Sequence, residues 1–115
     1  MKLIGVCIYT DNAKRLAEFY KIVLQEEPFQ EEQHYGFKKS QIAVYNPGNI
    51  KVAQDKNMSL MFVVPDLIME YKRLIQCFPE LTIVAPPERK PWGAFSFLFA
   101  DLDGNIISFV EGPEK

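Results

Sequence analysis

The chain has 115 residues, which is the size of one ordinary domain. Hydrophobic residues make up 48% of the sequence and charged residues 24%, so the composition excludes a disordered chain and predicts a globular fold. Thirteen Lys and Arg residues against 15 Asp and Glu residues give a net charge of −2, which argues against binding to nucleic acid.

Neither a membrane span nor a secretion signal is expected. The longest apolar run, Leu60–Pro65, is much shorter than the roughly 20 residues that cross a bilayer. Residues Met1–Ile4 lead directly into a strand-like segment without the apolar stretch of a signal peptide. Cys7 and Cys77 lie on separate predicted elements, which indicates two reduced, buried thiols in a cytoplasmic protein.

The first half of the chain predicts a strand, a helix and further strands. Leu3–Tyr9 is rich in strand-forming residues, and Asp11 is the expected N-cap of the helix that follows. The helix is amphipathic, and its apolar positions are Ala13, Leu16, Ala17, Tyr20, Val23 and Leu24. Residues 29–45 form an extended segment, and the turn at residues 46–49 leads into a strand that begins with Ile50 and Val52.

The second half predicts the same order of elements. An apolar strand, Ser59–Val64, is followed by Asp66 as N-cap and by a helix that ends before Pro79. The apolar positions of this helix are Leu67, Ile68, Tyr71, Leu74, Ile75 and Phe78. Three strands are expected after it, Leu81–Ala85, Phe95–Ala100 and Ile106–Glu111, with a loop over residues 86–93 and a hairpin turn at residues 103–105.

Two pairs of matching signals indicate an internal duplication. The caps Asp11 and Asp66 are 55 residues apart, and the turn glycines Gly48 and Gly104 are 56 apart. The alternative is a coincidence between common turn residues. We therefore predict an α+β protein of two βαβββ modules, residues 1–55 and 56–115, within one domain that spans residues 1–115.

Segments near both ends carry a family resemblance. Between Tyr9 and Leu24, a strand ends in Asp and a helix carries Phe19-Tyr20 followed by Val23-Leu24; Trp92-Gly93 and the sequence Asp-Leu-Asp-Gly-Asn at 101–105 come later. This pattern resembles the vicinal-oxygen-chelate superfamily, which includes glyoxalases, bleomycin-resistance proteins and extradiol dioxygenases. The resemblance implies curved sheets around a cavity and a homodimer. It departs from the family at Gln25, where Gly is usual, and at Leu102, where Pro is usual.

The resemblance also implies four positions at which enzymes of the superfamily hold a divalent metal. Counted from the motifs, these positions are Ile4, Val52, Leu60 and Ser108, and a slip of one residue brings in Gly5 or Ser59. None of these side chains is a His or a carboxylate, which are the ligands such ions require. We therefore expect no metal and no other cofactor, and the sequence favours a protein that is not an enzyme without deciding the question.

What remains at these positions is an apolar wall, which is typical of small-molecule pockets. The predicted ligand-binding residues are Trp92, Phe62, Phe95, Phe97, Ser108, Ile4 and Leu60. The same side chains could instead fill the space as an ordinary core, and Trp92 could stack on a ligand or close the end of a sheet. The acidic residues Glu26, Glu27, Glu31 and Glu32 could attract a cationic ligand or simply form a solvated strand edge.

Three functions follow as hypotheses. The first is a metal-free, bleomycin-resistance-like protein that binds a drug or another aromatic small molecule as a homodimer. The second is a glyoxalase- or dioxygenase-type enzyme that recruits its metal through Glu111, His34 or a partner subunit. The third is a structural or regulatory domain with a closed core. His34 as a general base and Cys7 as a nucleophile are weak candidates, because no carboxylate adjoins His34 in the sequence to orient it.

Overall fold

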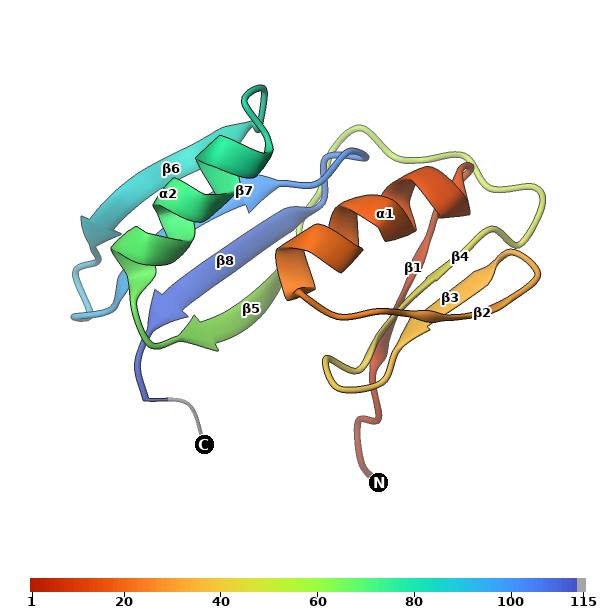
Figure 1. Cartoon of the computed structure of the whole chain (residues 1–115), viewed down its shortest axis with the longest axis horizontal. Helices are drawn as coiled ribbons and strands as arrows, with labels where there is room; N and C mark the ends of the chain where they lie inside the picture. The colour runs from red at the N-terminus through yellow and green to blue at the C-terminus, as the bar shows by residue number, and fades with distance from the viewer. Residues whose placement is uncertain (114–115) are drawn as a thin grey trace. The chain divides into compact units, whose positions relative to one another are not determined.

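The computed structural model describes residues 1–113 and divides into two compact units, Met1–Gln54 and a second that begins at Asp55 (Figure 1). Each unit has one helix and one four-stranded mixed sheet, so the prediction of an α+β protein with two βαβββ modules is confirmed. That both modules make one domain stays a prediction. Neither helix among the described residues has the length and hydropathy that a membrane span requires.

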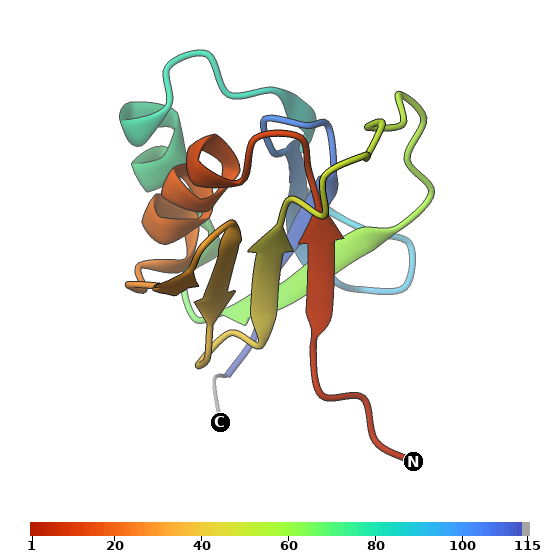
Figure 2. The same ribbon diagram turned by 90° about the vertical axis from the view of Figure 1, so that its right-hand side faces the viewer.

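The first unit forms a sheet in the order β1-β4-β3-β2. Its elements are β1 (Val6–Tyr9), α1 (Ala13–Leu24), β2 (Phe29–Glu31), β3 (His34–Phe37) and β4 (Ile42–Tyr45). Strand β4 lies between β1 and β3 (Figure 2), and it pairs in parallel with β1 and antiparallel with β3. The parallel pair requires a crossover connection, and α1 supplies it.

The second unit repeats this topology, with the sheet order β5-β8-β7-β6. Its elements are β5 (Ser59–Val64), α2 (Leu67–Cys77), β6 (Ile83–Arg89), β7 (Phe95–Ala100) and β8 (Ile106–Glu111). Strand β8 pairs in parallel with β5 and antiparallel with β7. The two sheets therefore correspond strand for strand, which supports the duplication proposed from the sequence.

Each helix buries its apolar stripe against one face of its own sheet. In the first unit, α1 packs on β3 and β4, where Phe37, Ile42 and Val44 are buried. In the second unit the core is aromatic: the ring centroid of Tyr71 on α2 lies 5.1 Å from that of Phe97, and Phe97 lies 5.5 Å from Phe109. Burying apolar side chains of this size stabilises each unit by roughly 1.5–3 kcal/mol per side chain.

The residue that caps α1 differs from the prediction. The N-cap is Asn12, whose Oδ1 accepts a hydrogen bond from the Arg15 backbone N–H at 3.2 Å, whereas Asp11 precedes the cap. Thr10 is buried and its hydroxyl accepts from the Asn12 N–H, which places the helix one residue later than the sequence pattern indicated. The helix ends at Gln25, a non-glycine residue in the left-handed region with φ of 53°.

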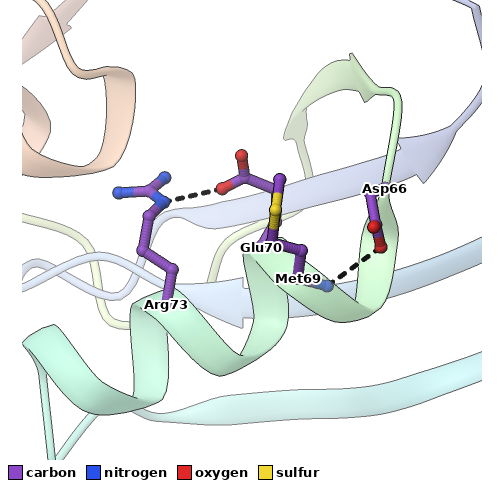
Figure 3. A network of polar contacts seen from close by, with 4 residues as sticks. All are labelled: Asp66, Met69, Glu70 and Arg73. Carbon is purple, nitrogen blue, oxygen red and sulfur yellow. Dashed lines mark hydrogen bonds and ion pairs between the residues drawn. The ribbon is translucent and has the colours of Figure 1, made fainter.

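The cap of α2 is the one predicted. The Asp66 carboxylate accepts from the Met69 backbone N–H at 3.1 Å, and one turn along the helix Arg73 donates to Glu70 at 2.7 Å (Figure 3). The backbone N–H of Leu67 donates to the Glu111 carboxylate, which ties the helix to the end of β8. Two free backbone donors at this helix start, the N–H groups of Leu67 and Met69, therefore have carboxylate acceptors within the unit.

Two predicted segments are placed differently. No strand begins at Ile50 or Val52, because β4 already completes the sheet and an Asx turn follows it, in which Gly48 N–H donates to Asn46 Oδ1. Gly48 and Gly104 are therefore not equivalent positions. The loop predicted over residues 86–93 is also shorter, since β6 continues through Pro86 and Pro87 to Arg89. Prolines are tolerated there because β6 is an edge strand with register shifts.

Candidate ligand-binding site

The sheet of the first unit has one face under α1 and one face that α1 leaves uncovered, which we call the open face. Cross-strand partners in the sheet point to the same side, and successive residues alternate. Because Ile42 and Val44 are buried under the helix, their neighbours Ala43 and Tyr45 belong to the open face. The register then assigns Cys7 and Tyr9 on β1 to the open face as well.

A row of small residues forms the floor of this face. Cys7 pairs with Ala43, Ala43 pairs with Gly36, and Gly36 pairs with Phe29 on the edge strand. The Phe29 ring folds over Gly36, so closely that a Cβ added at Gly36 would lie 2.3 Å from ring carbons. The floor is therefore low, and one aromatic ring rises from its edge.

The next row of the open face carries large rings. Tyr9, Tyr45 and His34 are successive cross-strand partners. The ring centroids of Tyr9 and Tyr45 are 6.2 Å apart, those of Tyr45 and His34 are 5.8 Å apart, and those of His34 and Phe29 are 5.9 Å apart. These spacings are typical of aromatic contacts, so four rings from four strands form one continuous wall.

Between this wall and the turn that joins β3 to β4 lies a hollow of about 320 Å³, which we call the trough. Its lining is mostly apolar, and its polar side chains come from Cys7, His34, Lys38 and Gln41. The Lys38 ammonium stands 5.1 Å from the centroid of the Phe29 ring. A hollow of this size with apolar walls and few polar groups is typical of sites that bind small molecules.

Cys7 lies on the floor of the trough, and the expectation that both thiols are buried is wrong. Cys7 and Cys77 are both free and exposed. Desolvation by the apolar surroundings nevertheless raises the pKa of the Cys7 thiol, because the thiolate loses hydration there. His34 does not form a catalytic pair with Cys7, since it lies two strands away and one row further along, about 10 Å or more between the backbones.

The second sheet does not present the predicted aromatic residues on its open face. Phe62 and Phe97 lie on the face covered by α2, because Phe97 contacts Tyr71 of the helix and both phenylalanines contact Phe109. Leu60 shares that face, since it pairs with the fully buried Ile107. Strand β5 is apolar at nearly every position, so the sequence contains no alternation from which its two faces could be distinguished.

The remaining predicted residues lie apart from one another in the fold. Ile4 precedes β1 and lines the trough, and Ser108 lies on the open face of the second sheet beside Met61. Phe95 begins β7 and lies 5.2 Å below the Arg89 guanidinium. Trp92 occupies the tip of the β6–β7 hairpin with 77% of its surface exposed, which excludes the alternative that it closes the end of a sheet.

Solved structures with this topology cover nearly the whole chain. A protein of unknown function from Agrobacterium tumefaciens str. C58 superposes with a TM-score of 0.82 at 20% identity over 98% of this chain and 95% of that one. A member of the glyoxalase/bleomycin resistance protein/dioxygenase superfamily from Sphaerobacter thermophilus gives a TM-score of 0.75 at 22% identity, with 97% and 98% of the two chains covered. The chain has the fold of this superfamily.

A lactoylglutathione lyase from Agrobacterium tumefaciens also has the glyoxalase-type fold, with a TM-score of 0.72 at 18% identity over 97% of this chain and 95% of that one. No family model and no curated protein matched the sequence. The resemblance predicted from the sequence is thus confirmed by the fold, at identities that do not extend to an activity.

Within this superfamily fold, three of the four expected metal positions move and Ser108 stays. Counting back from the true cap Asn12 leads to Gly5, and Ser59 corresponds to Gly5 because it lies two residues before Met61 as Gly5 lies two before Cys7. Ser108 pairs with Met61 as Ala43 pairs with Cys7, so Ala43 replaces Val52 as the fourth position. Glycine, alanine and two serines offer no imidazole, thiolate or carboxylate, and this set does not fit a divalent ion.

The alternative ligands are also committed elsewhere or stand alone. The Glu111 carboxylate accepts the Leu67 N–H, and His34 is held among the rings of Phe29 and Tyr45. Within residues 1–113, no three His, Cys, Asp or Glu side chains gather closely enough to hold an ion. The donor chemistry of the described residues therefore gives no support to the metalloenzyme hypothesis.

The acidic segment has a structural use that the sequence did not reveal. The Glu26 carboxylate accepts from the backbone N–H groups of Lys39 and Ser40 and from the Ser40 hydroxyl, at 2.8 to 3.1 Å. Glu27 forms an ion pair with Lys21 at 3.0 Å. Glu26 thus holds the turn that carries Lys38 to the trough, and neither carboxylate is among the residues that line the trough.

Proposed function

We propose that the protein binds a small, flat, apolar molecule in the trough of its first unit, without a metal. The observation that carries the proposal is the juxtaposition of a low floor, made by Cys7, Ala43 and Gly36, with the rings of Phe29 and His34, which line the trough and belong to the row of four contacting rings. A planar ligand would lie on the floor and place its edge or face against the rings, where aromatic contacts contribute about 0.5–1.5 kcal/mol beyond the burial of area.

Three sequence-based expectations belong to this proposal. The ligand is a drug or another aromatic compound, the protein assembles as a homodimer, and no reaction is catalysed. Sedimentation velocity at several protein concentrations measures the assembly independently of the ligand. The hypothesis of a closed core is less well supported, because the hollow of about 320 Å³ remains between the side chains.

The two free cysteines provide the experiment. Cys7 lies in the trough and Cys77 ends α2 in the other unit, and both are exposed, so Cys77 serves as an internal reference. The protein is alkylated with iodoacetamide in the presence of 2-naphthol, and the modification of each cysteine is followed by mass spectrometry. We expect 2-naphthol to slow the alkylation of Cys7 at least severalfold and to leave that of Cys77 unchanged.

A pair of variants makes the test specific. Phe29→Ala removes one ring of the wall, and we expect the protection of Cys7 to fall about tenfold in apparent affinity. Ile22→Ala removes a comparably exposed apolar side chain on α1, away from the trough, and should leave the protection intact. If 2-naphthol slows both cysteines equally, or slows neither, the proposal fails.

A further inference from the structure

The charges around the trough are unevenly distributed, and this asymmetry indicates the class of ligand. Lys38 and His34 are the ionisable side chains of the lining that carry or can gain a positive charge, and no Asp or Glu is found among the described lining residues. The expectation of a cationic ligand drew on the acidic segment, whose Glu26 is already engaged by three donors.

The Lys38 ammonium is placed at the border of the trough and is not engaged by an acidic side chain. It projects from the turn after β3 to within 5.1 Å of the Phe29 ring centroid, and no ion pair of Lys38 is found among residues 1–113. A cation over a ring face retains its capacity to donate hydrogen bonds to an anion.

Other charged residues lie near the trough but are not part of its lining. Lys39 adjoins Lys38 on the same turn and adds positive charge outside the trough lining. Glu31 is the cross-strand partner of His34 on the edge strand and is not among the lining residues either. Glu26 and Glu27 lie with Lys38 and Lys39 around the neighbouring hollow of the turn, whereas the described lining of the trough itself contains the Lys38 ammonium and no carboxylate.

From these positions we infer that the ligand is an aromatic acid: a flat apolar body with one carboxylate or comparable anionic group. The body lies on the floor of small residues beneath the rings, and the anionic group meets the Lys38 ammonium at the border. This inference rests on the proposed function and specifies its ligand class. The amide of Gln41, on the same border, supplies a further hydrogen-bond donor for the anion.

Three probes of one shape test the inference: 2-naphthoate, uncharged 2-naphthamide and the 2-naphthylmethylammonium ion. The dissociation constant of each is measured by titration at low salt, with the protection of Cys7 as a second readout of occupancy. We expect naphthoate to bind about tenfold more tightly than the ammonium probe, with the amide between them, because only the anion gains from Lys38. The preference should shrink as salt is raised.

Two lysine variants on the same turn provide the matched control. Lys38→Gln removes the charge but keeps a polar side chain one atom shorter, and should weaken naphthoate binding about fivefold, while the affinity for naphthamide changes less than twofold. Lys39→Gln removes a charge that lies outside the trough lining and should affect naphthoate less than twofold. Thermal melts of both variants verify that the turn still folds.

The outcomes separate the two claims. If all three probes protect Cys7 with similar affinity, or if Lys39→Gln weakens naphthoate as much as Lys38→Gln, the preference for anions is refuted and the trough remains a binding site. If the ammonium probe binds best, the ligand is a cation and the inference is wrong. If none of the three protects Cys7, the inference and the proposed function are both wrong.

Discussion

The pKa of the Cys7 thiol depends on the apolar side chains around it in the trough. This thiol is exposed to reagents, yet its apolar neighbours raise its pKa because the thiolate is less well hydrated in the trough. A raised pKa leaves less thiolate at any pH below it, and the thiolate is the species that reacts with alkylating agents. We therefore expect the accessible thiol of Cys7 to react more slowly near neutral pH than the same thiol in an unfolded chain.

This yields a prediction for the pH dependence of alkylation. In the folded protein, the midpoint of the pH–rate profile of Cys7 should lie above that of the same cysteine in protein unfolded by guanidinium. The profiles are measured by quantifying iodoacetamide labelling of the Cys7 peptide from pH 7 to pH 11. A folded-state midpoint at or below the unfolded one would contradict the apolar environment assigned to the thiol.

Trp92 is also tested at the scale of a single side chain. Because it is exposed at the hairpin tip, Trp92→Ala should change the free energy of unfolding by less than about 0.5 kcal/mol. Trp92 is not among the described residues that line the trough, so the affinity for a ligand in the trough should change less than about twofold. The stacking that the sequence predicted would instead lower the affinity about tenfold, which corresponds to ~1.4 kcal/mol. Chemical denaturation measures the first quantity and ligand titration the second. A large loss of stability would refute the exposed position.

At the scale of elements, the sequence pattern misplaced both the start of α1 and the two faces of β1. The helix begins one residue after the position that the sequence indicated, and the pairing of β1 with β4 places alternate β1 residues on the opposite face from the one expected. Ile4, Val6 and Ile8 were expected to share the exposed concave side, but Val6 and Ile8 belong to the face under α1. Gly5, Cys7 and Tyr9 take their place.

A pair of substitutions tests which residue caps α1. Asn12→Ala removes the side chain that accepts the Arg15 N–H and should destabilise the protein by about 1 kcal/mol. Asp11→Ala should cost much less, because Asp11 is exposed and its side chain does not cap the helix. Both values come from denaturant unfolding. The reverse order of the two losses would restore Asp11 as the cap of α1.

The turn between β7 and β8 depends on one buried carboxylate. Asp101 Oδ1 accepts from the backbone N–H groups of Asp103 and Asn105, and Oδ2 accepts from the Asn105 side-chain amide, all at 2.8 to 2.9 Å. The Asp-Leu-Asp-Gly-Asn segment that carried part of the family resemblance is therefore a structural turn. Gly104, with φ of 85°, has the left-handed conformation that the turn requires.

Substitution of this carboxylate should measure its contribution. Asp101→Ala leaves two backbone donors without their acceptor and should destabilise the protein by about 2–3 kcal/mol. Asp101→Asn retains one oxygen that can accept both backbone donors, and we expect it to recover at least half of that loss. The unfolding free energies of the two variants give the comparison, and equal losses would assign the effect to charge rather than to the hydrogen bonds.

For the whole molecule, much of the topology could be predicted from the sequence. The strands Phe95–Ala100 and Ile106–Glu111 have the predicted bounds, and both helices lie where their apolar periodicity placed them. Those signals are local: a helix stripe, a turn with Gly-Asn, a proline after a helix. They are sufficient to predict an α+β fold of two βαβββ modules, because the hydrophobic periodicity of each helix or strand is visible in its own residues.

The sequence did not predict most of the proposed binding site, because this site depends on pairing between strands. The sequence pattern does not predict that Cys7, Ala43 and Gly36 lie side by side, because small residues on three separate strands have no common periodicity. The aromatic residues of β5 and β7 were predicted to bind the ligand because they are large and apolar. For the same reason they are packed in the core under α2. Of the predicted residues, Ile4 alone is among the described residues that line the trough.

We propose above that a small molecule occupies the open face of the first sheet, and this proposal can be tested directly. The most direct measurement is the change of backbone amide NMR shifts when ¹⁵N-labelled protein is titrated with 2-naphthoate. We expect the largest changes of amide shift at Cys7, Ala43, Gly36 and the turn at Lys38, and small changes in the core under α2. Saturable shifts that centre on other residues, or no shifts at millimolar ligand, would contradict it.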